Sequence, residues 1–171
     1  NDDDLIKLAQ FDQIFVNDQI KIDPDSLITI SFIDNSILTL EGDSEFFVEK
    51  FDNLSEEPEC IIAIIKGKFS FESGTISKKD KGMMKIKLSE MEVVLKGTLV
   101  TDNNSDEGKK ISLVKDSMGN VGELDITVDG QTTTISEEAA GLNLSGDNEI
   151  ESTTLSEEEK KKLYKKEENE L

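Results

Sequence analysis

The sequence predicts an all-β protein: an antiparallel sandwich or roll of short strands with a C-terminal helix. Three observations support this prediction. Isoleucine and valine are concentrated in short runs, and β-branched side chains pack well on a pleated sheet. Apolar and polar residues alternate within most of these runs, as expected for half-buried strands. Clusters of Asn, Asp, Gly and Pro separate the runs, and these residues favour turns.

The predicted strands in the first half of the chain are separated by acidic turns. We expect them at residues 11–16, 19–22, 27–33, 37–40 and 45–51. Asn17-Asp18 supplies the first turn, and Pro24 ends the second strand because proline blocks ladder pairing. Residues 34–36, Asp-Asn-Ser, predict a hairpin, since Asn35 tolerates the left-handed conformation of a tight turn.

The second half is expected to begin with a central strand. Residues 60–65 are apolar on both faces, which predicts a strand covered on each side, and Gly67 interrupts it. Later strands are expected at 68–72, two within 83–100, then 111–114, 122–128, 131–135 and 142–144. Asp129-Gly130 is a strong hairpin signal between two of them.

The tail carries the predicted helix. Ser156 and Glu159 have the spacing of a capping box, and Leu155 contributes to a thin apolar face. The chain is therefore expected to comprise an N-terminal arm (1–10), a β domain (11–145), and a linker with a charged C-terminal helix (146–171).

The charge of the chain limits its partners. It has 38 acidic and 19 basic residues, a formal net charge of −19, and every basic residue is lysine. Such a surface repels phosphate backbones and anionic lipids, so we expect no nucleic-acid partner. No apolar run reaches the roughly 20 residues of a membrane helix, so direct membrane insertion is not expected either.

The residues that catalysis usually requires are missing. The chain has no His, and it contains neither a G-x-S-x-G nucleophile motif nor a phosphate-binding loop. Its one cysteine, Cys60, begins the most apolar run and is expected to be buried and inert. We therefore expect a protein that is not an enzyme.

One acidic segment is a candidate metal site. Asp102, Asn104 and Asp106 place oxygen ligands at alternate positions, as calcium requires. The twelfth position of this segment is Leu113, where an EF-hand has Glu. The segment is therefore either a weak calcium site or a solvated hairpin tip, and calcium is the one candidate cofactor.

The order of strands and turns resembles the FecR domain family. Residues 32–40, FIDNSILTL, are similar to the family pattern F-x-D-G-S-x-x-x-L, with Asn35 in place of the usual Gly. A Ser-containing turn at 43–44, a strand at 46–48 and the segment 64–69, IIKGKF, also match the family order.

Further matches are looser. Residues 84–98 resemble the family's strand pair ending in Gly-Thr, but Leu88-Ser89 stands where Thr-Pro is usual, and Lys96 where Arg is usual. The resemblance covers roughly residues 27–144. It implies an all-β extracytoplasmic domain without catalytic residues, in a family that includes periplasmic sensors.

These observations predict a non-enzymatic, bacterial, extracytoplasmic module of the periplasm or cell surface that binds a protein in a sensor or surface assembly. One alternative is a structural subunit of a surface layer or filament, which self-assembles through strand edges and terminal arms. A second alternative is a calcium-stabilised adhesion module. The sequence does not name the protein partner.

Overall fold

The computed structural model describes residues 6–79, 82–105, 108–145 and 149–161. Within these residues it confirms a mostly β protein, with thirteen strands and a short helix at residues 157–161. The strands are β1 (Gln19–Lys21), β2 (Leu27–Ser31), β3 (Ile37–Glu41), β4 (Glu45–Asp52), β5 (Glu59–Glu72), β6 (Met83–Leu88), β7 (Met91–Lys96), β8 (Leu99–Ser105), β9 (Gly108–Val114), β10 (Glu123–Val128), β11 (Gln131–Ile135), β12 (Ala140–Ser145) and β13 (Ile150–Thr154). A 3₁₀ helix, η2 (Ile76–Lys78), precedes β6.

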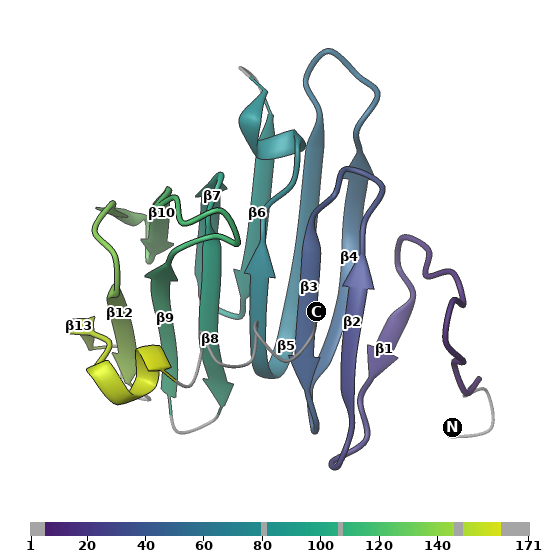
Figure 1. Cartoon of the computed structure of the whole chain (residues 1–171), viewed down its shortest axis with the longest axis horizontal. Helices are drawn as coiled ribbons and strands as arrows, with labels where there is room; N and C mark the ends of the chain where they lie inside the picture. Colours follow the sequence, from purple (N-terminus) through teal and green to yellow (C-terminus); the bar gives the residue numbers. More distant parts are fainter. Residues whose placement is uncertain (1–5, 80–81, 106–107, 146–148, 162–171) are drawn as a thin grey trace.

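Two sheets share the long strand β5 (Figure 1). Sheet A has the order β1-β4-β5-β6-β7-β10-β11, and sheet B has the order β2-β3-β5-β8-β9-β12-β13. All neighbours are antiparallel except β5 and β6, which are parallel. The first half of β5 therefore belongs to sheet A and the second half to sheet B.

One hydrophobic core lies between the two sheets. Alternate residues of each strand point into it, such as Met84, Ile86 and Leu88 of β6, all fully buried. Leu38 and Phe71 reach the same core from sheet B. The alternation read from the sequence thus predicts which side chains are buried in these strands.

Gly67 lets β5 pass from one sheet to the other. Its φ is 106°, a region that side chains other than glycine rarely adopt. A Cβ atom at this position would lie 2.5 Å from the Cα of Ser44, so the backbone of the neighbouring turn leaves no space. The expected interruption at Gly67 is therefore wrong: residues 60–65 and 68–72 form one strand that bends there.

The N-terminal segment corrects another prediction. Residues 11–16 form no strand, because aspartate side chains hold the backbone in turns. The N–H of Ala9 donates to Asp12 and the N–H of Phe15 to Asp18, at 2.7 and 2.8 Å. Phe11 adopts a φ of 73°, which an extended strand does not allow.

Two further predictions differ from the structure. The outer face of residues 61–65 is not fully covered, because Ile65 is exposed. The sheet continues past residue 145, since β13 pairs with β12 inside the stretch expected to be a linker. The predicted turns at Asn35 and at Asp129-Gly130 are confirmed, with positive φ at all three residues.

The C-terminal helix is capped as predicted. Ser156 and Glu159 exchange hydrogen bonds between side chain and backbone, and Leu155 packs against Val114 and Ala139. Lys110 of β9 donates to Glu159 at 2.8 Å. This hydrogen bond, followed by those from Ser156, lowers the pKa of Glu159 from 4.5 to about 2. No helix in the described ranges is long and apolar enough to cross a membrane.

Substitution of Gly67 tests the strand crossing. We expect Gly67→Ala to lower the free energy of unfolding by at least about 2 kcal/mol, because it adds both backbone strain and a steric clash. Gly119→Ala is the control, since Gly119 also has positive φ but has no atom within 4 Å of the added Cβ. It should cost only about 1 kcal/mol. Denaturant unfolding measures the free energy of unfolding of both variants. Equal losses of stability would contradict the claim that only glycine allows β5 to cross between the sheets at residue 67.

The ionisation of Glu159 predicts how the cap responds to acid. Since the folded pKa lies below the ordinary value, the cap stabilises the fold above pH 4.5, and this contribution is lost as the pH falls from 4.5 to about 2. In Lys110→Gln the pKa should rise towards 4.5, whereas Lys115→Gln should leave it unchanged. Titration of the Glu159 carboxyl carbon by NMR measures its pKa. An ordinary pKa in the wild type would contradict the hydrogen bonds from Lys110 and Ser156 to this carboxylate.

Candidate interaction surface

The residues that resemble the family motif form a buried structural cluster. Asp34 and Ser36 are 2% and 0% exposed. The Ser36 hydroxyl donates to Asp34 at 2.8 Å and accepts the N–H of Gly74 at 2.8 Å. The N–H of Ile76 also donates to Asp34, at 3.3 Å. The cluster fastens the turn between β2 and β3 to the loop after β5, and it offers no open site.

Cys60 is buried and chemically quiet, as expected. Burial, with smaller effects of the Asp34 and Glu59 charges, raises the pKa of its thiol to about 12. The thiol therefore stays protonated at neutral pH, and the thiolate is the nucleophilic form. Cys60 contributes packing rather than chemistry.

The three calcium candidates are not brought together as a described site. Asp102 and Asn104 lie on β8 rather than in a loop, and Asp106 lies outside the described residues. Asn104 is buried, and its side-chain amide donates to the carbonyls of Ile64 and Ile65 at 3.0 and 3.1 Å. The described part of the chain holds no group of three or more acidic, His or Cys side chains that could bind a metal. The calcium site stays a prediction.

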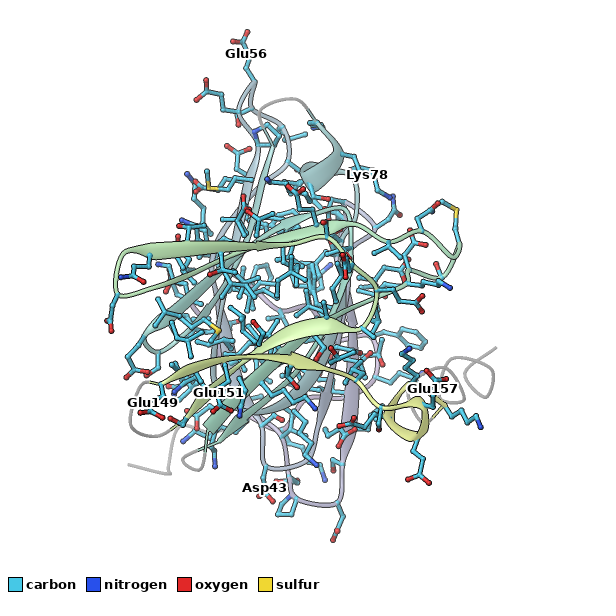
Figure 2. All side chains as sticks on the ribbon, turned by 90° about the vertical axis from the view of Figure 1, so that its left-hand side faces the viewer. Asp43, Glu56, Lys78, Glu149, Glu151 and Glu157 are labelled. Carbon is cyan, nitrogen blue, oxygen red and sulfur yellow. The ribbon has the colours of Figure 1, made fainter. Side chains whose placement is uncertain are left out.

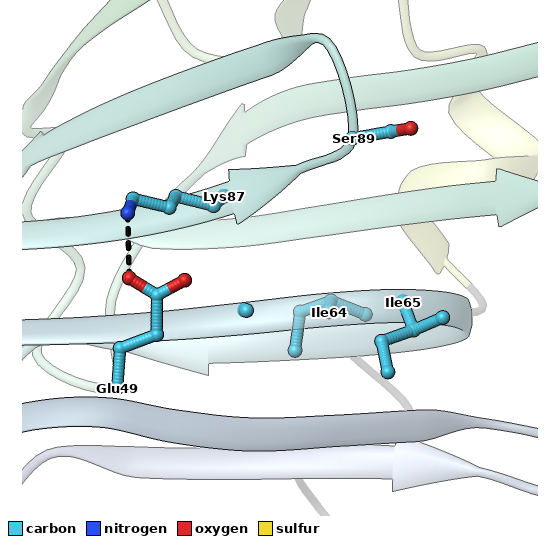
Figure 3. A pocket seen from close by; sticks show the side chains of 6 residues that line it. Glu49, Ile64, Ile65, Lys87 and Ser89 are labelled. Carbon is cyan, nitrogen blue, oxygen red and sulfur yellow. Dashed lines mark hydrogen bonds and ion pairs between the residues drawn. The ribbon is translucent and has the colours of Figure 1, made fainter. Parts of the chain in front are cut away.

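A shallow hollow of about 270 Å³ lies on the outer face of sheet A (Figure 3). It opens where β6 stops pairing with β5, which is at Ala63. Lys87 and Glu49 form an ion pair of 2.5 Å at one end, while Ile64 and Ile65 line the other. An ion pair beside an open apolar floor provides neither a nucleophile nor an acid–base pair, so the hollow suits contact rather than catalysis.

Exposed apolar side chains gather near the start of the chain. Eight of the fourteen large hydrophobic residues that the described structure exposes belong to residues 6–37; they are Ile6, Leu8, Phe11, Phe15, Val16, Leu27, Ile33 and Ile37. Figure 1 shows the arm, β1 and β2 on the same side of the molecule. We call this region the N-terminal edge. Apolar side chains gathered at an exposed edge are typical of protein contact sites.

The sequence did not reveal this edge, because Phe11 and Phe15 resembled core residues of a strand. In the structure they are 92% and 64% exposed. The sequence signal against a strand was the spacing of Asp12, Asn17 and Asp18. Short polar side chains of this kind bind nearby backbone groups and favour turns over strand pairing.

Three glutamates mark the opposite side of the molecule. In Figure 2, which faces this side, Glu151 lies on β13, Glu149 lies just before it and Glu157 lies at the start of the C-terminal helix. Hydrogen bonds link β13 to β12 on one side, and Glu151 lies on the outermost strand. A charged edge strand resists pairing with other chains. The edge strand of this side therefore carries a charge, whereas the N-terminal edge exposes apolar side chains.

Comparisons with known proteins identify relatives of the chain. The family model described as FecR protein matches residues 18–121. Two solved structures of a candidate anti-sigma factor from Parabacteroides distasonis are similar in fold, each with a TM-score of 0.63 and 11% sequence identity. The similarity covers 80% of this chain but only 59% of the Parabacteroides chain. No curated protein matches the chain significantly in sequence.

The role of Asn104 can be tested by substitution. Asn104→Ala should lower the free energy of unfolding by about 1–3 kcal/mol, because the carbonyls of Ile64 and Ile65 lose a donor, and calcium should not change this loss. The control Asn53→Ala, in the loop after β4, should change it by less than about 0.5 kcal/mol. An unchanged stability of Asn104→Ala would contradict the structural role.

A melting temperature that calcium raises in the wild type but not in Asp106→Ala would support the calcium hypothesis.

Proposed function

This chain belongs to the FecR protein family, and from that membership we propose that it is a non-enzymatic, protein-binding module of a bacterial sensor acting outside the cytoplasm. The observation that carries this proposal is the family match, which spans β1 to β9 and so includes strands of both sheets. FecR proteins and their relatives are regulators, which fits a signalling role.

The chemistry of the chain supports a binding role. It has no His, and the pKa of its buried cysteine is too high for a nucleophile at neutral pH. The carboxylates of the open hollow and of the helix cap are tied to lysines, as in the Glu49–Lys87 and Glu159–Lys110 pairs. The N-terminal edge, in contrast, exposes apolar side chains that a partner would cover.

The structural neighbours support a protein as the partner. The Parabacteroides protein is described as a candidate anti-sigma factor, and a factor of that kind acts by contact with another protein. The match covers only 59% of the Parabacteroides chain. That this chain acts as a sensor module is therefore a proposal and does not follow from the similarity itself. The acidic surface favours a partner with basic residues at the interface.

The proposal predicts a change in gene expression when the domain is removed. In the source bacterium, deletion of the codons for residues 18–154 should alter the transcripts of a limited set of genes, and restoration of the chain should reverse this. The structural-subunit alternative predicts unchanged transcripts and a purified chain that grows into long assemblies with concentration. Light scattering over a concentration series measures the second outcome.

A strain in which the chain is restored with a cysteine substitution tests the compartment in which the chain lies. Glu56 lies exposed in the loop between β4 and β5, so Glu56→Cys supplies a reactive thiol, while buried Cys60 stays silent. A membrane-impermeant maleimide should label Glu56→Cys in intact cells and leave the wild-type chain unlabelled. Labelling of Glu56→Cys only after lysis would contradict an extracytoplasmic location.

A further inference from the structure

The strand β2 lies in the N-terminal edge, and within the described residues one of its two sides is unpaired. In the described part of the chain it pairs with β3 alone. Its sequence, Leu-Ile-Thr-Ile-Ser, contains no charge and no proline. Natural proteins usually protect edge strands with one of these devices. The other edge of sheet B, β13, carries Glu151, and β1 is only three residues long.

The hydrogen-bond pattern shows which backbone groups of β2 are free to pair. The N–H of Phe32 donates to the carbonyl of Ser36 at 2.9 Å, so these two residues form a hydrogen-bonded pair. Such pairs alternate along an antiparallel ladder. The backbone groups of Ile28 and Ile30 therefore face β3, and those of Leu27, Thr29 and Ser31 face the open edge.

Side chains along β2 leave apolar surface for an added strand to cover. Leu27 is 51% exposed on the outer face. On the inner face Ile28 and Ile30 contact the core but are only partly buried, whereas Leu38 and Leu40 of neighbouring β3 are fully buried. The core is thus incompletely covered at this edge, and one more strand would cover it.

The charge around β2 limits what that strand can be. Asp23 and Asp25 lie in the turn that leads into β2, and Glu41 is the register partner of Leu27. The chain as a whole carries a net charge of −19. A second copy of this chain would bring the same negative charge, whereas a strand with basic side chains would meet an opposite field.

We propose that β2 receives an extended segment of a partner protein as an added strand, in which β-branched apolar residues alternate with Lys or Arg. This inference rests on the proposed function and specifies where and how the module binds. The apolar residues cover Ile28 and Ile30, and the basic residues lie near the carboxylates of Asp23, Asp25 and Glu41. The outward backbone groups of Leu27, Thr29 and Ser31 complete the ladder.

The test uses matched proline variants of two edge strands. Thr29→Pro removes an outward N–H of β2 without removing a backbone hydrogen bond to β3. Thr132→Pro is its control on the β11 edge, because the two-residue turn makes Val128 and Gln131 a hydrogen-bonded pair and turns the Thr132 N–H outward. Both threonines also contact a cross-strand threonine hydroxyl, Thr39 and Thr127, at 3.3 and 2.8 Å. Ser31→Pro is a second blocking variant in case Thr29→Pro does not fold.

The probe is a fluorescein-labelled eight-residue peptide of alternating lysine and valine, and a glutamate–valine peptide is its charge control. Fluorescence anisotropy with the full chain should show binding to the wild type and to Thr132→Pro with equal affinity. Binding to a folded Thr29→Pro or Ser31→Pro should be at least tenfold weaker, as should binding of the glutamate peptide. NMR should place the largest amide shifts at Leu27, Thr29 and Ser31.

Three binding results, and one result on oligomeric state, would overturn the inference. The binding results are no binding of the lysine peptide to the wild type, equal binding to a folded proline variant of β2, and loss of binding in Thr132→Pro alone. Dimerisation of the wild type that Thr29→Pro abolishes would assign the edge to a second copy and would overturn the partner segment. Each result leaves the proposed function intact, since that is judged separately by gene expression.

Discussion

The passage of β5 from one sheet to the other is the constraint on which the rest of the structure depends. At Gly67 the backbone takes a conformation that favours glycine and passes directly against Ser44. Just before this bend, the carbonyls of Ile64 and Ile65 accept hydrogen bonds from the buried amide of Asn104. Because one strand serves both sheets, a change at Gly67 disturbs the pairing of β3, β4 and β8 together.

The most recognisable residues of the chain serve this framework and leave function to the surface. Asp34 and Ser36 use their side chains to hold Gly74 and Ile76, so a motif that identifies the family is a buried hydrogen-bond network. The family can therefore be identified from residues that touch no partner. Specificity must come from exposed residues, and the exposed apolar residues are concentrated at the N-terminal edge.

The contrast between the edges gives the binding hypothesis its physical content. On one side, β13 carries an acidic side chain that discourages pairing; on the other, β2 presents an uncharged strand with backbone groups that pair with nothing described. An acidic protein with an uncharged open edge at β2 is suited to a basic, extended partner and disfavours its own copies. Electrostatics thus selects the partner, while the strand edge supplies the geometry.

The sequence by itself determined the fold class, most strands, the hairpin turns at Asn35 and Asp129-Gly130, and the helix cap, because each depends on neighbours within a few residues. The prediction of a strand at residues 11–16 was wrong, because aspartate side chains bind backbone N–H groups that a strand would use. The prediction of a break at Gly67 was also wrong, because β5 bends there and continues. Only the tertiary structure decided that β6 runs parallel to β5, that Asn104 is buried, and that β2 is an edge. These features depend on which strands meet, and strand alternation determines which face is buried but not which strand becomes the neighbour.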